Sequence, residues 1–508
     1  MLLIVIISFL LFMFVYCKYR IVKNYWRKKG VPFLKPLPLL GSMSPNLSRK
    51  DNIINFIINL YNSHPTKRYF GFHQFHQPTL LIRDPELIKT ILVKEFASFS
   101  DHSMFNRGIC EAYEGLFFIP ANRGWHSVRT ILSPSFTNTK LKHMWKLVDE
   151  CGNIFVEYFK KQGSVVVDLK DSFSRYTNDA ILTTAFGVKC DSFSNKDNLI
   201  FLMGKKLVDF SGIKGLKAFS YNISPFFTKL FNVQIVTQSA GRIFAHIVEE
   251  TLKMRKEHNI VRPDMINLML ESKAKANVDE SDSFKDQHKL MFTNKDITAA
   301  AISFYFAGFD TTSTSLTFMA YALGVNPEIQ DKLRKEVDDA IDRCNGELSF
   351  EELMNLEYLE MVIIEALRIW PPAPFLDRLC IKSFTIDPVT ADETPVTIDA
   401  GTTIWIPVAG LNHDPKYFEN PDNFDPERFN ENNKFKRHQF SYIPFGGGPR
   451  TCLGSRYAVF VCKVILSKIV QHFELVPCEK TQIPLRIGAG VSVIPDDGVW
   501  LNFKPRKN

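Results

Sequence analysis

The sequence Phe445-Gly446-Gly447-Gly448-Pro449-Arg450-Thr451-Cys452-Leu453-Gly454 lies close to the C-terminus of a chain of 508 residues. Three consecutive glycines allow the backbone to turn sharply and to approach a flat ligand closely. Apolar residues at helical spacing follow Gly454, so Cys452 is expected just before a helix begins. The positive end of a helix dipole favours a thiolate, and a cysteine thiolate is one of the few ligands with which proteins hold haem iron.

The spacing Phe445-x-x-Gly448-x-Arg450-x-Cys452-x-Gly454 resembles the haem-thiolate signature of the cytochromes P-450. The resemblance implies a mainly α-helical cytochrome P-450 fold with a small β region, in which Cys452 holds the iron of haem b. It also implies a monooxygenase that inserts one oxygen atom of O2 into an apolar small molecule, a xenobiotic or an endogenous lipid. The sequence around the signature is most similar to the animal microsomal branch that contains drug- and toxin-oxidising enzymes.

Composition limits the other classes of function. The length would allow about three domains, but no linker, low-complexity tract or repeat divides the chain after residue 50, so we expect one catalytic domain over residues 42–508. Residues 1–50 hold nine Lys and Arg and no acid, which leaves 53 bases against 54 acids in the remainder. We therefore expect no nucleic-acid partner. Nine cysteines without a C-x-x-C pair indicate a reducing compartment, with Cys462 as a packing residue.

The N-terminus carries an apolar run at residues 2–17 that is followed by lysines and arginines. A cleaved signal peptide would have its charges before the run and small residues after it. We therefore predict a transmembrane signal anchor at residues 1–17, with the catalytic domain in the cytosol; a cleaved or merely interfacial segment is the alternative. Residues 18–41 resemble the basic, proline-rich hinge of microsomal P-450s, which implies the endoplasmic reticulum membrane and contact with a lipid bilayer.

A long apolar helix is predicted in the centre of the chain. Thr293-x-x-Asp296 resembles a capping box, and Asn326-Pro327 ends this helix and starts the next one. Such a helix should thread through the core because it is apolar almost all round.

A polar interruption of this helix, Ala307-Gly308-Phe309-Asp310-Thr311-Thr312, needs a reason, because buried polar groups are costly. It resembles the oxygen-activation motif of the P-450 family, and the resemblance implies that Asp310 and Thr311 deliver protons. The alternative is that the two threonines bond back to carbonyl groups four residues earlier and bend the helix.

Three further groups of residues take roles from the resemblance. Haem is expected to contact, besides Cys452, the residues Trp125, Arg129, Arg378, Phe445 and Arg450. A buried charged cluster that supports haem insertion is expected from Glu365, Arg368 and Arg428. The substrate pocket is expected to include Phe105, Phe118, Phe304, Phe306, Ala373, Phe375 and Val491. His73 and His76 have no third ligand nearby, so exposed loop histidines are expected rather than a metal site.

Electrons are expected from NADPH through a separate membrane-bound flavoprotein, the P-450 reductase, with cytochrome b5 as a further candidate partner. The chain contains no dinucleotide fingerprint or flavin module and cannot be its own reductase. Two other functions are weighed against this one: a haem-thiolate isomerase, and a membrane-tethered haem or ligand carrier without turnover. The intact pair Asp310-Thr311 argues against both, since neither needs delivered protons.

Overall fold

The computed structural model describes residues 6, 13, 16, 19–43, 51–103, 115–208, 238–278, 293–391, 393–434, 437–490, 493–495 and 497–506. Its helices are α3 (Ile53–Asn62), α4 (Pro85–Lys89), α5 (Trp125–Leu132), α6 (Asn138–Lys160), α7 (Leu169–Ile181), α8 (Leu199–Val208), α11 (Gln238–His258), α12 (Met265–Val278), α13 (Asn294–Val325), α14 (Pro327–Arg343), α15 (Phe350–Met354), α16 (Glu357–Ile369), α17 (Val408–Asn412), α18 (Glu431–Lys434) and α19 (Ser455–His472). The strands are β1 (Tyr69–Gln74), β2 (Gln77–Ile82), β3 (Val165–Asp168), β4 (Leu376–Leu379), β5 (Phe384–Ile386), β6 (Val396–Ile398), β7 (Thr403–Ile406), β8 (Phe473–Val476) and β9 (Trp500–Pro505). The predicted mainly helical fold with a small β region is confirmed.

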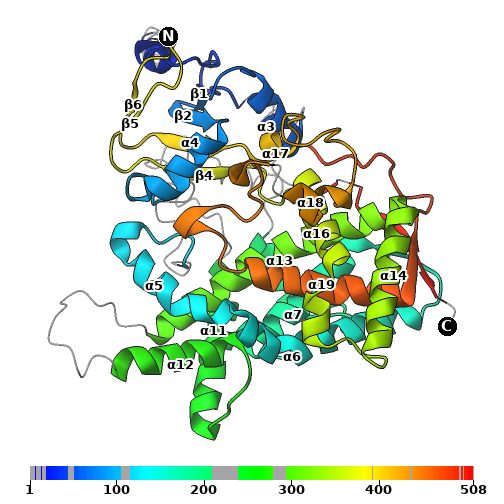
Figure 1. The fold of residues 1–508 in the computed structure, drawn as a ribbon. Helices are drawn as coiled ribbons and strands as arrows, with labels where there is room; N and C mark the ends of the chain where they lie inside the picture. Colours follow the sequence, from blue (N-terminus) through cyan, green and yellow to red (C-terminus); the bar gives the residue numbers. More distant parts are fainter. Residues whose placement is uncertain are drawn as a thin grey trace.

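Helix α13 runs through the middle of the helical part and packs against α7, α11, α16 and α19 (Figure 1). Its start is the predicted capping box: the Asp296 amide donates to the Thr293 hydroxyl, and the Asp296 carboxylate accepts from the Thr293 amide. Its end is also as predicted, because Asn326 follows the last turn and Pro327 begins α14. The helix thus places residues 307–312 within the helical part of the protein.

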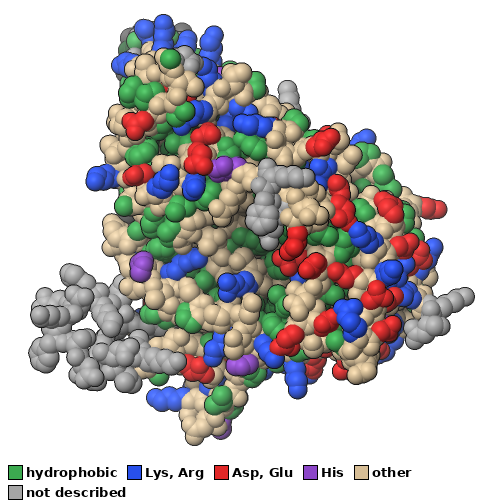
Figure 2. Space-filling model, viewed as in Figure 1, with side chains coloured by type: hydrophobic (Ala, Val, Ile, Leu, Met, Phe, Trp, Pro, Cys, Tyr) green, Lys and Arg blue, Asp and Glu red, His purple; other side chains and the backbone are tan. Residues whose placement is uncertain are grey.

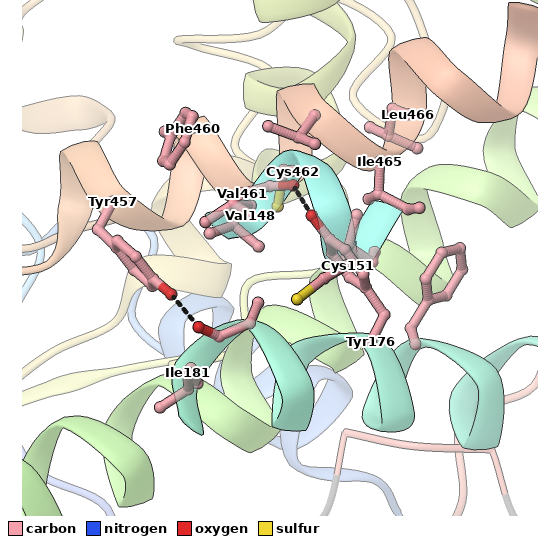
Figure 3. Close-up of a cluster of buried hydrophobic side chains, with 14 of the residues drawn as sticks. Val148, Cys151, Tyr176, Ile181, Tyr457, Phe460, Val461, Cys462, Ile465 and Leu466 are labelled. Carbon is pink, nitrogen blue, oxygen red and sulfur yellow. Dashed lines mark hydrogen bonds between the residues drawn. The ribbon is translucent and has the colours of Figure 1, made fainter. Parts of the chain in front are cut away.

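Helix α19 is held against α6 and α7 by the apolar cluster in Figure 3. Tyr176 of α7 donates its hydroxyl hydrogen to the carbonyl oxygen of Val461 at 3.1 Å, which ties the two helices together. Cys462 is buried beside it, and burial raises the pKa of its thiol to about 12. Cys462 is therefore a packing residue, as the sequence predicts. The packing of α19 on α6 and α7 also fixes the position at which the preceding loop ends.

A four-stranded sheet in the order β1-β2-β7-β4 lies near the N-terminus (Figure 1). The pairs β1–β2 and β4–β7 are antiparallel, whereas β2–β7 is parallel. The chain leaves β2 as predicted: the Asp84 side chain accepts from the Leu87 amide and caps α4, which begins with Pro85. Two smaller sheets have the orders β3-β9-β8 and β5-β6.

The sequence-based prediction for His73 is wrong. This residue lies on β1 and is fully buried, whereas His76 is exposed in the turn that follows. Burial lowers the pKa of His73 to about 4, because the charged imidazolium is poorly solvated there. The alternation of Phe70 and Phe72 before it was the signal for a strand.

The N-terminal segment packs on this sheet. Residues 19–28 are helical, and the fully buried Trp26 donates its indole N–H to the Phe72 carbonyl oxygen at 3.1 Å. A Cβ at Gly71 would lie 2.4 Å from the Trp26 ring, so only glycine leaves room for this contact. Figure 2 shows Lys and Arg side chains gathered over this segment, with acids and bases mixed around α14. Most of residues 1–17 lie outside the described residues; among the described helices, none combines the length and apolar character needed to span a bilayer.

Candidate active site

The loop before α19 is shaped by its glycines and holds Cys452 in a fixed place. Gly446 and Gly448 both adopt the left-handed region, with φ of 79° and 69°. A Cβ at Gly448 would lie 2.0 Å from the Leu92 carbonyl oxygen, so this position accepts glycine alone. The Cys452 amide then donates to the Phe445 carbonyl oxygen at 2.8 Å, which closes the loop.

The thiol of Cys452 combines exposure with a dense protein environment. The residue is exposed, yet burial is the largest cause of a raised pKa, opposed by the Gly454 amide and the Arg129 guanidinium. The thiol is thus accessible from one side and closely surrounded by protein on the others. In the polypeptide alone, desolvation outweighs the Gly454 amide and the Arg129 guanidinium, so the thiol form is favoured there; the predicted thiolate bound to iron stays a prediction.

Helix α13 presents a stripe of small residues that the core does not cover. Ala307 and Thr311, one turn apart, are exposed, although the following residues 312–324 are all buried. The Thr311 hydroxyl donates to the Ala307 carbonyl oxygen at 2.6 Å, which is the back-bond that the sequence left as an alternative. This bond uses the hydroxyl hydrogen and leaves the lone pairs of the oxygen facing the uncovered side.

Asp310 points toward helix α7, where sequence reasoning placed no partner. The Lys170 ammonium lies 2.8 Å from the Asp310 carboxylate and also donates to the Ser313 and Thr314 hydroxyls at 2.7 and 2.8 Å. Burial lowers the pKa of Lys170, while the nearby Asp310 opposes the shift. The Asp310 side chain is still 40% exposed, so one side of it is paired with Lys170 and another side is accessible.

Replacing Lys170 with methionine should destabilise the protein by about 1–3 kcal/mol. The change leaves Asp310 without its cation and two hydroxyl groups without a donor, but the exposure of Asp310 keeps the loss below that of a fully buried pair. Urea unfolding monitored by circular dichroism measures the effect. The matched control is Lys189→Met, since the Lys189–Glu150 pair is exposed on both sides and should change stability by less than about 0.5 kcal/mol.

Arginines gather at the other end of the candidate site. Arg129 of α5 donates to the Thr451 carbonyl oxygen at 2.7 Å, beside Cys452. Arg450 lies 4.1 Å above the Trp125 ring and donates to the carbonyl oxygens of residues 100, 116 and 119. Arg378 on β4 is buried, and its Nε has no hydrogen-bond partner among the described residues. Burial lowers the pKa of both Arg378 and Arg450 to about 10, although Asp377 and Asp101 respectively oppose these shifts.

The predicted scaffold cluster is present and buried. Arg368 donates through Nε and Nη2 to the two carboxylate oxygens of Glu365, both at 2.8 Å, and both side chains are inaccessible to solvent. Arg368 also donates to the carbonyl oxygens of Asn412 and Asn423. Arg428 Nε approaches Glu365 at 3.4 Å, an ion pair that falls short of a hydrogen bond. The cluster therefore connects α16 to the segment after α17.

The predicted pocket residues fall into different surroundings. Phe118 and Phe306 lie 6.4 Å apart between ring centroids, and Phe304 meets Phe136 edge to face at 5.1 Å. Phe375 stacks on Trp405 at 3.9 Å. Ala373 is exposed. Phe105 and Val491 lie outside the described residues. Sequence reasoning missed the ring of Phe117, which is 47% exposed beside Phe118.

Comparisons with known proteins decide the family. The family model "Cytochrome P450" matches residues 31–502. The chain belongs to the cytochrome P450 family. It is 38% identical to cytochrome P450 9e2 of Blattella germanica, over 96% of this chain and 94% of that protein. It is 34% identical to probable cytochrome P450 9f2 of Drosophila melanogaster, over 95% of each chain, and 33% identical to cytochrome P450 3A31 of Mesocricetus auratus, over 95% and 93%. The P450 is accordingly a haem-thiolate monooxygenase.

The residues of this P450 fit haem. A thiol on a glycine-shaped loop is a suitable iron ligand, and the buried Arg378 Nε needs an acceptor such as a carboxylate. Arg129 lowers the pKa of both the Cys452 thiol and Arg450, so it contributes to the electrostatic surroundings of both. Haem supplies the one-electron and O2 chemistry that amino-acid side chains lack. Trp125 is buried and Phe445 is partly buried against the same apolar core cluster, so both add apolar surface near these groups.

Proposed function

We propose that Cys452 is the axial thiolate of this P450 and that Asp310 and Thr311 move protons to the site where O2 reacts. Two observations together carry the proposal. The Cys452 thiol is exposed on a loop in which Gly448 leaves no room for a Cβ. On the central helix α13, Ala307 and Thr311 are exposed as well. The reduced carbon-monoxide difference spectrum of the membrane-expressed protein tests the ligand: a strongly red-shifted Soret band is expected, and an unshifted band would contradict it.

The proposed roles of Asp310 and Thr311 follow from their different surroundings. Asp310 is in contact with the buried Lys170 and with solvent, so it can exchange protons with water without opening the core. Thr311 keeps its hydrogen on the Ala307 carbonyl oxygen, so its oxygen is free to accept a hydrogen bond and orient a water molecule. No hydrogen bond joins the two described side chains, so a water molecule is needed to complete the relay.

Replacing Thr311 with alanine should lower the amount of product per NADPH consumed by roughly 10- to 100-fold. The matched control is Thr317→Ala, because the Thr317 hydroxyl makes the same bond to the carbonyl oxygen four residues earlier, at 2.8 Å, but is buried away from the uncovered stripe. If the bond to the carbonyl oxygen is the only role of Thr311, both variants will form the same amount of product per NADPH consumed, and this result would contradict the relay. A loss of product per NADPH that is confined to Thr311→Ala supports it.

We propose further that the protein acts at the endoplasmic reticulum membrane and receives electrons from an NADPH-dependent flavoprotein reductase, with cytochrome b5 as a candidate second donor. Exposed Arg20, Lys23, Arg27 and Lys28 next to the predicted anchor suit the anionic surface of the cytosolic leaflet. The substrate class we propose is an apolar xenobiotic or lipid, because the described pocket candidates are mostly phenylalanines. Reductase-dependent oxidation is the test, and turnover without a reductase would favour an isomerase.

A further inference from the structure

His102 lies inside the arginine cluster, although sequence reasoning gave it no role. Its Nδ1 is 3.0 Å from the Asp377 carboxylate and 3.4 Å from Nη1 of Arg378. Its ring stacks on Phe117 with centroids 4.1 Å apart, and its side chain is only 12% exposed. Asp377 is held in place because its other carboxylate oxygen accepts from the amide and hydroxyl of Ser103. The imidazole is therefore a fixed, titratable part of the cluster.

The charges around His102 come from three segments of the chain. Asp101 precedes it, Asp377 and Arg378 lie on β4, and Arg450 lies in the loop before Cys452. Two guanidinium groups thus face two carboxylates, and the charges balance while the imidazole is neutral. Haem carries two carboxylates, which would leave this cluster with an excess of negative charge. A protonated His102 would offset one of these charges.

We propose that His102 takes up a proton when the haem carboxylates bind to this arginine cluster, and so makes haem retention depend on pH. The inference rests on the proposed function only in that haem must bind through Cys452 with its carboxylates toward the arginine cluster. Protonation keeps the Nδ1–H that Asp377 accepts and adds an Nε2–H donor, so it requires no rearrangement of the cluster. In the polypeptide alone, burial lowers the pKa of His102 from its ordinary value of 6.5, while Asp377 opposes the shift.

The sign of the pH effect follows from linkage. Added carboxylates favour the imidazolium form, so the pKa of His102 is higher with haem bound than without it. Haem is therefore retained best below the haem-free pKa of His102, and this gain is lost as pH rises through the bound-state pKa. Each unit of difference between the two pKa values is worth a tenfold change in haem affinity. The Cys452 thiol releases its proton on binding iron and gives the opposite slope, so only the comparison of variants isolates His102.

The test is the rate of haem transfer from the full-length, haem-loaded protein to excess apomyoglobin, measured from pH 5.5 to 8.5. His102→Gln should lose haem about tenfold faster than the wild type at the acid end and at the same rate at the alkaline end. His102→Arg carries a permanent charge and should lose haem more slowly than the wild type at the alkaline end only. His126→Gln, a change at an exposed histidine on α5, should follow the wild type throughout.

The ratio of rates decides the outcome. A ratio of His102→Gln to wild type that does not change with pH overturns the proposal. If His102→Gln does not retain haem at all, the ratio of the haem-loss rate of His102→Arg to that of the wild type decides instead. A value of this ratio that does not change with pH again overturns the proposal. The reduced carbon-monoxide spectrum of the wild type separates this result from the proposed function: a thiolate-type band with a constant ratio contradicts the role of His102 alone.

Discussion

Replacing Cys452 with alanine should abolish the red-shifted Soret band of the reduced carbon-monoxide complex and all reductase-dependent product formation. The variant removes the thiol but keeps the bond from the residue-452 amide to the Phe445 carbonyl oxygen, and the left-handed glycines that shape the loop are untouched. The side chain of residue 452 is exposed, so its loss leaves no cavity in the core. We therefore expect a protein that folds with near wild-type circular dichroism but cannot bind haem through sulfur.

Cys462→Ala is the control for this prediction. Cys462 lies on the helix that follows the loop and is buried, with a pKa raised to about 12, so it cannot supply a thiolate near neutral pH. Its replacement should leave the spectrum unchanged and cost about 1 kcal/mol of unfolding free energy through lost packing. A red-shifted band that survives in Cys452→Ala and disappears in Cys462→Ala would reverse the assignment. Differential absorbance of matched membrane preparations measures both variants.

Features fixed by local chemistry were predictable from the sequence. The capping box at Thr293 and the proline at position 327 set the ends of α13 without help from distant residues. The glycine loop was equally readable, since Gly446 and Gly448 adopt left-handed φ values of 79° and 69° that favour glycine. The pair Glu365 and Arg368 was visible because three residues separate them on one helix. In each case the interaction is encoded within a short stretch of chain.

Contacts between distant segments were not predictable. Lys170 and Asp310 are 140 residues apart, and only the packing of α7 on α13 brings them together. His102 and Asp377 are 275 residues apart. The pKa of Cys452 in the polypeptide alone has the same origin, because desolvation depends on everything packed around the thiol. The sequence thus identifies the reactive groups, whereas their ionic partners and protonation equilibria arise from tertiary structure.

Replacing Glu365 with glutamine should destabilise the protein by about 3–5 kcal/mol, enough to prevent accumulation of haem-loaded enzyme. The glutamine side chain would keep the shape of the original one but leave Arg368 as a fully buried cation without a counter-ion. It would also weaken the contacts of the Asp425 amide and Arg428, which both converge on the same carboxylate oxygen. Urea unfolding of the purified protein measures the stability, and haem absorbance per protein measures the loading.

The matched control for this buried pair is Asp331→Asn on α14. Asp331 and Arg334 have the same spacing of three residues, but the Asp331 side chain is 66% exposed, so water replaces the lost partner. The expected change is below about 1 kcal/mol, with normal haem loading. Burial raises the pKa of Glu365 despite Arg368, which means that desolvation outweighs the attraction within the pair. The pair therefore contributes a defined geometry for the segment around Asn412 and Asn423 rather than net stability, and similar losses in both variants would contradict this role.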